Sequence, residues 1–286
     1  MIGETLATDP GPIEPASQVD PVGPVGLPTL SVYLAGGIAV RGANGAVVGE
    51  REFAGRQGRR LFVRLATSHE PIPQEDLADD LWGPKWPAAW QTALRALVSK
   101  LRATLAKVGA QNAIASRDGT YALRLPAGAW LDLDVAAEAI HAAEVALSDG
   151  DRSRAAGWAL AARAVANRTL LPGEDAEWLD ELRRGLVDIH LRALECLGEV
   201  WLGGGDAALA AYDATQAIAL DPFRESAHRL LIRAHLAAGE HPAALRAFVA
   251  CRTLFEEELG VVPAPETVAL VTPLLAKSSL ADRETA

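Results

Sequence analysis

The segment from residue 75 to residue 105, EDLADDLWGPKWPAAWQTALRALVSKLRATL, decides the fold of the first part of this 286-residue chain. Its second half predicts one long helix, Pro87–Val108, which Gly109 stops. At about 100° per residue the apolar side chains of this helix fall into one narrow stripe. The stripe consists of Leu94, Leu97, Val98, Leu101 and Leu105. We therefore expect one side of the helix to be buried and the other side to be free.

The free side of this helix is basic, carries short side chains and contains no acidic residue. It presents Thr92, Arg95, Ala96, Ser99, Lys100 and Ala103, with Arg102 on its flank. A helix that is only solvated usually alternates Glu with Lys. A helix that enters the major groove of DNA needs small residues near the bases, and Arg or Lys for base edges and phosphates. This face therefore favours a recognition helix.

A hairpin is predicted directly after the helix, in the segment SRDGTYALRL at residues 116–125. Two short apolar runs, 113–116 and 121–125, flank Arg117-Asp118-Gly119-Thr120, and Asp-Gly is a strong signal for a two-residue hairpin turn. An arginine near the tip of such a hairpin can enter the narrow, electronegative minor groove of DNA. The hairpin is therefore a candidate wing.

The residues before the helix complete the pattern. Asn44-Gly45 separates the apolar runs 30–40 and 46–48, which predicts a first hairpin, and helical periodicity follows at 56–68 and 74–81. Taken singly, each feature also fits an ordinary small α+β domain. The order of sheet, three helices and hairpin, together with the acid-free helix face, favours a winged helix-turn-helix over residues 30–126.

The sequence of this region resembles the DNA-binding domain of the Streptomyces antibiotic regulatory protein family, which is similar to the winged helix of OmpR/PhoB-type response regulators. The matching pieces are Leu81-Trp82-Gly83, the pattern Leu94…Val98-Ser99…Leu101-Arg102, and the wing Arg117…Gly119…Tyr121. Two positions depart from the pattern. Thr120 stands where the wing usually has Gly, which leaves the turn geometry open, and Arg95 stands where response regulators often have Asp, which leaves its role open.

The resemblance implies roles for most of the predicted DNA-binding residues, which are Trp82, Thr92, Arg95, Ala96, Ser99, Lys100, Arg102 and Arg117. By the resemblance, Lys100 reads bases and Ala96 contacts a thymine methyl group. Ser99 and Arg102 then contact the DNA backbone, and Arg117 enters the minor groove. Trp82 falls where an indole N–H reaches a phosphate, but it fits a core position between the second and third helices equally well.

The charge of the chain is unevenly spread, although its net value of −10 at first argues against nucleic acid. Residues 1–29 contain four acidic and no basic residues and many prolines, which predicts a disordered, Pro-rich acidic leader. Residues 31–126 contain 13 Lys or Arg and eight Asp or Glu, a net charge of +5. Residues 127–286 contain 14 basic and 25 acidic residues, a net charge of −11. This asymmetry favours contact with nucleic acid by the first region.

Residues 130–277 predict an all-α domain with tetratricopeptide-like repeats, followed by a short tail at 278–286. Gly205-Asp206 and Gly239-Glu240 open two copies at a spacing of 34 residues, the period of that repeat. Gly150-Asp151 opens a third copy, and a longer helix at 174–202 lies between. Packed helix pairs of this kind form a scaffold with a groove, which suits protein binding better than catalysis.

This second region resembles the bacterial transcriptional activator domain of the same family, from WLDLDVAAEA at residue 130 to LFEEELGVVPAPETVAL at residue 270. The resemblance implies a transcriptional activator that binds promoter direct repeats in double-stranded DNA as a homodimer and recruits RNA polymerase, often for a secondary-metabolite gene cluster. The helical groove is open to a small-molecule or protein effector. The alternative is a tetratricopeptide adaptor whose winged helix binds protein; lost base readers or acidic residues on the helix face would favour it, and the sequence shows neither.

The sequence contains no arrangement of residues typical of an enzyme. Its six histidines are scattered without metal-ligand spacing, no phosphate-binding glycine motif occurs, and Cys251 fits a buried repeat position. We therefore expect no enzymatic activity, no cofactor and no metal. The two cysteines and the lack of a long apolar segment or signal peptide predict a cytoplasmic protein without contact to a membrane.

Overall fold

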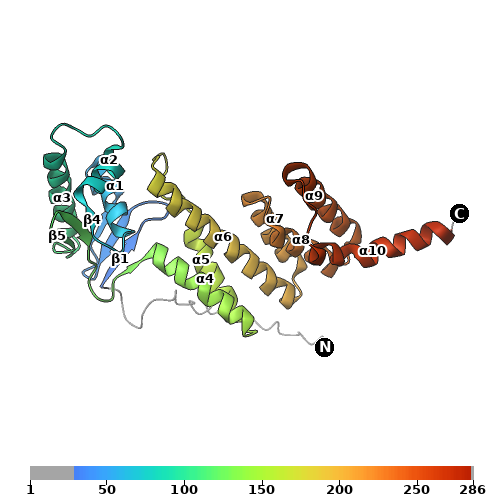
Figure 1. The fold of residues 1–286 in the computed structure, drawn as a ribbon. Helices are drawn as coiled ribbons and strands as arrows, with labels where there is room; N and C mark the ends of the chain where they lie inside the picture. The colour runs from blue at the N-terminus through green and yellow to red at the C-terminus, as the bar shows by residue number, and fades with distance from the viewer. Residues whose placement is uncertain (1–28, 285–286) are drawn as a thin grey trace, which may run out of the picture.

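The computed structural model describes residues 29–284 of the chain, and the side chains up to residue 275. The predicted acidic leader, residues 1–29, therefore lies outside the described residues except for Thr29. The described chain has a mixed α/β region followed by an array of helices that extends away from it (Figure 1). This is the predicted fold class, a winged helix-turn-helix followed by an all-α, tetratricopeptide-like region.

The chain begins with a sheet whose strand order is β3-β2-β1-β7. The strands are β1 Leu30–Tyr33, β2 Ala39–Gly42, β3 Val47–Gly49 and β7 Trp130–Leu131. The β2–β3 hairpin turns at Asn44-Gly45, as predicted. The apolar run 30–40 does not form a single strand, because the chain reverses at Gly36-Gly37 and β1 pairs antiparallel with β2. The parallel partner β7 was missed, since two residues are too short for a periodic signal.

Three helices pack on one hydrophobic core: α1 Gly55–Ala66, α2 Gln74–Trp82 and α3 Trp90–Ala106. The apolar stripe of α3 is confirmed, because Leu94, Val98, Leu101 and Leu105 are buried. The helix is shorter than the predicted span 87–108. Its first expected residues form a turn in which the Pro87 carbonyl accepts from the Trp90 N–H, and the helix ends at Ala106.

The wing is a hairpin of β5 Ile114–Arg117 and β6 Thr120–Leu123, extended by β4 Ile72–Pro73. Asp118 and Gly119 have φ values of 49° and 76°. Positive φ at both central residues is the requirement of a type I′ hairpin turn, which Asp-Gly satisfies at low cost. The predicted hairpin is therefore present, and Thr120 in the position of the usual glycine does not prevent it.

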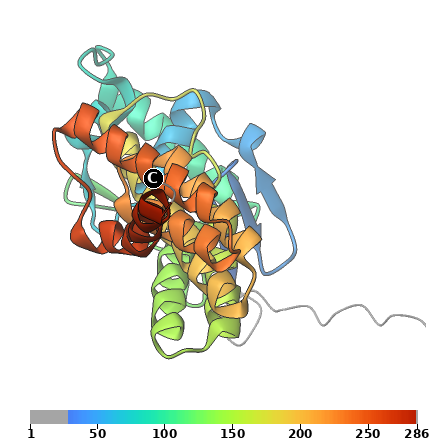
Figure 2. The same ribbon diagram turned by 90° about the vertical axis from the view of Figure 1, so that its right-hand side faces the viewer.

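The helical region contains α4 Asp132–Ser148, α5 Arg152–Ala166, α6 Glu177–Gly204, α7 Ala207–Leu220, α8 Glu225–Ala237, α9 His241–Leu259 and α10 Pro265–Glu284. Each helix packs mainly on the next, and Figure 2 shows them stacked when viewed from the C-terminal end. The predicted repeat starts are helix starts: Asp151 and Asp206 accept from the Arg154 and Leu209 N–H groups as N-caps. The last helix continues to Glu284, although a tail was predicted from residue 278.

Small residues allow these helices to approach closely. A Cβ atom on Gly198 would lie 2.3 Å from Leu230 Cδ2, so a larger residue at this point of α6 would require the buried Leu230 side chain on α8 to move. Cys196 and Cys251 are buried, as predicted for Cys251, and burial raises the pKa of each thiol to about 11. Both cysteines therefore act as small apolar residues and not as reactive thiolates.

The two regions share one hydrophobic core. Leu170, Leu171, Leu179 and Leu186, from the α5–α6 connection and α6, belong to the same cluster as the winged-helix core. Strand β7 ties the start of the helical region into the first sheet, and the buried carboxylate of Asp132 accepts from the Leu34 and Ala35 N–H groups. The helical region is therefore docked on the winged helix by buried contacts.

Candidate nucleic-acid interface

The outward face of α3 is exposed along its length. The predicted site residues Thr92, Arg95, Ala96, Ser99 and Lys100 are all exposed, opposite the buried apolar stripe. Helix α3 contains no acidic residue, and neither Arg95 nor Lys100 takes part in an ion pair within residues 29–275. The structure thus brings two cations together with three short side chains on one accessible surface.

Arg102 differs from the other predicted residues on α3, because its guanidinium is engaged within the protein. Its Nε and Nη2 atoms donate to the Ile114 carbonyl at 3.3 and 3.0 Å, and the residue is half-buried. Ile114 is the first residue of β5, so Arg102 fastens the wing to α3. This role was missed because it depends on a contact between elements.

The turn between α2 and α3 is rich in tryptophan. Trp82 is half-buried against the core at the end of α2. The indole Nε1 of Trp86 donates to Asp79 Oδ1 at 2.9 Å, and its ring contacts that of Trp90 at 4.9 Å and 62°. These contacts order the turn beside the first residues of α3. Sequence reasoning missed Trp86 and Trp90, although their four-residue spacing was visible.

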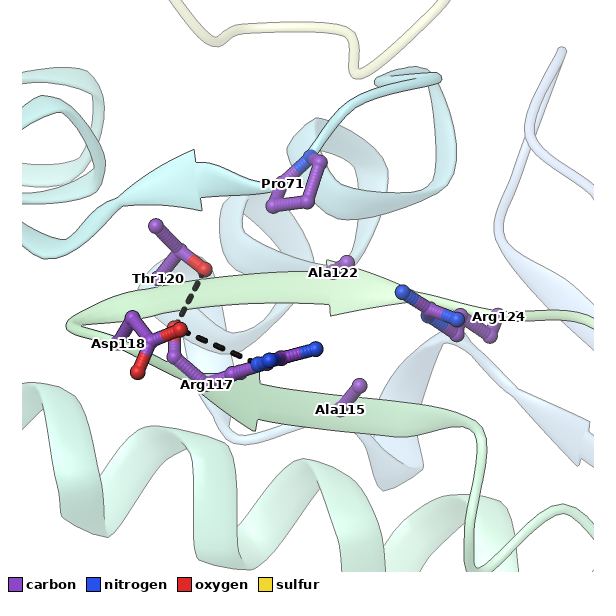
Figure 3. Close-up of a pocket in the computed structure, with 7 residues that line it drawn as sticks. All are labelled: Pro71, Ala115, Arg117, Asp118, Thr120, Ala122 and Arg124. Carbon is purple, nitrogen blue, oxygen red and sulfur yellow. Dashed lines mark hydrogen bonds and ion pairs between the residues drawn. The ribbon is translucent and has the colours of Figure 1, made fainter.

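The tip of the wing carries an ion pair of its own. Arg117 Nε lies 3.1 Å from Asp118 Oδ2, and the two side chains are 89% and 85% exposed. The Thr120 hydroxyl donates to the Arg117 carbonyl at 2.7 Å and braces the turn (Figure 3). Arg117 is therefore accessible at the tip, as predicted, but it has an acidic neighbour.

The solvent-facing side of the wing is hollowed. A shallow depression of about 460 Å³ is lined by Pro71, Ala115, Arg117, Asp118, Thr120, Ala122 and Arg124 (Figure 3). Ala115 and Ala122 face each other across the two strands of the wing, and Arg117 and Arg124 add two cationic side chains to the lining (Figure 3). Arg124 was not among the predicted site residues. The alternation of side chains along β6 could have identified it, because Thr120, Ala122 and Arg124 must share one face.

The basic charge of the winged helix is only partly available to a ligand. Arg56 pairs with Glu174 at 2.6 Å, Arg64 with Asp80 at 2.6 Å and Lys107 with Glu52 at 3.0 Å. A backbone hydrogen bond from Gly49 and the ammonium of Lys107 hold the pKa of Glu52 below its ordinary value. The arginines of α1 thus pair with acidic groups of the protein. Arg95 and Lys100 on α3 are exposed without such a partner within residues 29–275, as are Arg41, Arg51 and Lys85 in other parts of the winged helix.

Residues 29–284 contain neither a cluster of metal-ligating side chains nor a membrane-spanning helix. No group of three or more His, Cys, Asp or Glu side chains in this part of the chain is arranged to hold a metal ion. No helix there is long and apolar enough to cross a membrane.

Among solved structures, Mycobacterium tuberculosis EmbR in complex with a low-affinity phosphopeptide superposes with a TM-score of 0.77 at 21% sequence identity. The similarity covers 88% of this chain and 66% of the EmbR chain, so this chain spans slightly less than two thirds of that protein. A weaker similarity joins it to the C-terminal TPR-containing domain of a Plasmodium falciparum FK506-binding protein. There the TM-score is 0.40 at 14% identity, with 52% of this chain and 93% of that chain covered.

A search of curated proteins found no match. The family model described as bacterial transcriptional activator domain matches residues 131–275, which is half of the chain. This range coincides with β7 and the helical array up to α10. The superposition on EmbR covers 88% of the chain, so it includes both the winged helix and the helical array that the family model matches. The chain therefore belongs to the bacterial transcriptional activator domain family.

Proposed function

We propose that this transcriptional activator binds double-stranded DNA, with α3 in the major groove and the β5–β6 wing in the adjacent minor groove. The observation that carries the proposal is the exposed, acid-free face of α3 beside an arginine-bearing wing. Side chains as short as Ala96 and Ser99 let the helix backbone approach the base edges. The cations Arg95 and Lys100 then meet bases and phosphates.

The contacts with DNA divide into positioning and base recognition. Arg117, and Trp82 through its indole N–H, supply contacts outside the major groove, and Arg124 adds a phosphate contact on the side of the wing. Thr92, Arg95, Ala96, Ser99 and Lys100 lie on the face that meets base edges. Arg102 supports this surface through β5 and contacts the DNA backbone only if it leaves the Ile114 carbonyl.

The remaining parts of the proposal follow from the family. The activator binds direct repeats near a promoter as a homodimer, recruits RNA polymerase in the cytoplasm, and controls a secondary-metabolite gene cluster. The helical array supplies the contacts between copies, or takes up a small-molecule or protein effector in its groove. The family is one of transcription regulators, and the proposal assigns the chain no enzymatic step and no cofactor.

The experiment begins with selection of bound sites from random double-stranded DNA by the full chain. Affinity for the selected site is then measured at several salt concentrations for the wild type, Lys100→Ala and Arg117→Ala. Each variant is expected to bind more weakly and to lower the slope of log affinity against log salt by about one. Arg246→Ala is the matched control, because Arg246 is an exposed cation on α9, outside the interface.

Different outcomes would refute the assignment of the DNA-binding residues and the proposal that the chain is a DNA-binding regulator. Wild-type affinity in both Lys100→Ala and Arg117→Ala would refute the site assignment. Weak, sequence-independent binding by the wild type would refute the regulator proposal. It would favour the alternative of a tetratricopeptide adaptor whose winged helix binds protein.

A further inference from the structure

Three arginines on α1 face the helical region instead of DNA. Arg56, Arg60 and Arg64 are four residues apart, so they share one face of the helix. Arg56 Nε donates to Glu174 Oε2 at 2.6 Å, and Arg60 Nη1 lies 3.8 Å from the same oxygen. Arg60 and Glu174 are 8% and 6% exposed. Because a buried charge is costly without its partner, this contact holds α1 against the connection between α5 and α6.

The end of α2 receives a cap from the helical region. The last carbonyl groups of a helix have no partner within it and must be satisfied from outside. The Asp80 carbonyl accepts from Arg60 Nη2 at 2.7 Å and from the indole Nε1 of Trp178 at 3.4 Å. Trp178 is the second residue of α6. A tryptophan of the activator region therefore completes the C-terminal end of the first helix of the helix-turn-helix.

Arg64 of α1 contacts both Asp80 at the end of α2 and Trp178 at the start of α6. Arg64 Nε donates to the Asp80 carboxylate at 2.6 Å, and the guanidinium carbon of Arg64 lies 5.8 Å from the centre of the Trp178 ring. A cation over an indole face is attracted by the ring, so Arg64 links the tryptophan to α2. Asp80 thus contacts Arg60, Arg64 and Trp178 at the point where α2 ends.

This point controls the path of the chain into the recognition helix. The N–H of Gly83 donates to the Asp79 carbonyl at 2.8 Å in the last turn of α2, and the connection to α3 begins there. If the end of α2 frays, that connection loses its fixed start and α3 loses part of its orientation. In Figure 1, α1 and α2 lie between α3 and α6.

We propose that Trp178 and Glu174 of the activator region are positioning residues for the helix-turn-helix. They fix the end of α2, and thereby the angle at which α3 is presented, without contacting DNA. The consequence for DNA affinity rests on the proposed function, whereas the capping of α2 does not. In this proposal the helical region helps to orient α3 for DNA binding, in addition to binding partners.

The test uses the full chain with Trp178→Phe, which keeps an aromatic ring and removes the N–H donor. Affinity for the selected DNA site is expected to fall about two- to tenfold, the range for one hydrogen bond. The salt slope is expected to stay at the wild-type value, because no phosphate contact is lost. Without DNA, hydrogen exchange of the Gly83 amide is expected to become faster. Glu174→Gln is the second variant, with the same expected pattern.

The matched control is Trp158→Phe, because Trp158 packs in the separate core of α4, α5 and α6. Wild-type affinity and wild-type Gly83 exchange in both variants would overturn the proposal. A reduced salt slope would also overturn it, because that result marks a lost phosphate contact. If the wild-type chain fails to select a DNA site, the proposed function fails. Hydrogen exchange of the Gly83 amide then tests the capping of α2 without DNA. Faster exchange in the variants would support the capping, and unchanged exchange would refute it.

Discussion

Arg117 and Asp118 form an ion pair of 3.1 Å at the tip of the wing, with both side chains almost fully exposed. An exposed pair of this kind contributes little to stability. The pair matters for DNA binding at the proposed interface, because Asp118 places a negative charge beside Arg117, which we expect to enter the minor groove. The pair therefore opposes the approach of phosphate.

Replacing Asp118 with asparagine is expected to strengthen DNA binding. The change removes a negative charge and frees Arg117, and asparagine tolerates the positive φ of 49° that the turn requires. Fluorescence anisotropy at several salt concentrations should show a lower Kd, most clearly at low salt. Glu257→Gln on the exposed face of α9 is the control of equal charge change. Equal or weaker binding by Asp118→Asn would show that the pair does not oppose DNA.

Arg102 is expected to matter more for the stability of the wing than for contact with DNA. Arg102→Met keeps much of the apolar stem and removes both donors to the Ile114 carbonyl. We expect the free energy of unfolding in urea to fall by about 1.5–3 kcal/mol, the range for hydrogen bonds from a charged group. Lys100→Ala, two residues away on the exposed face of α3, should leave it within about 0.5 kcal/mol. If both variants were equally stable, the contact would not support the wing.

Arg124 is expected to contact DNA, although the sequence did not single it out. Arg124→Ala should weaken binding at all sites by a similar factor and lower the salt slope by about one, because a phosphate contact carries no sequence information. Selection from random DNA should return the same motif for the variant as for the wild type. An altered motif would instead assign base recognition to Arg124.

The ion pair of Glu144 with Arg192 predicts a pH-dependent contribution to stability. Two hydrogen bonds of 2.7 and 2.6 Å join the side chains, and the Arg192 guanidinium holds the pKa of Glu144 below its ordinary value of 4.5. A lowered pKa in the folded state means that the contribution is complete above pH 4.5. It is then lost as the pH falls through the lowered value. Unfolding in urea should show wild type more stable than Glu144→Gln at pH 7, and the gap should shrink below pH 4.5. A gap that does not change with pH would exclude this charge effect.

Much of the fold was predictable from local patterns. The stripe of α3, the Asp118-Gly119 turn and the Gly-Asp repeat starts depend on neighbours within about four residues, so periodicity and turn stereochemistry reveal them. Helix ends were less accurate, as at Pro87, because the turn before α3 depends on how the preceding residues pack. Strand β7 was missed because its only signal is its partner β1, about one hundred residues earlier in the chain.

The sequence by itself determined a basic, acid-free face on α3, an arginine at the tip of a hairpin, and a helical array with a 34-residue period. These features follow from residue types at fixed short spacings, and short spacings fix which side chains share a face. Only the tertiary structure decided which cations are engaged by other groups of the protein. Arg56 meets Glu174, 118 residues away, and Arg102 meets a backbone carbonyl of the wing. A count of charges cannot reveal such partners, because they are chosen by the packing of distant elements and not by their neighbours in the chain.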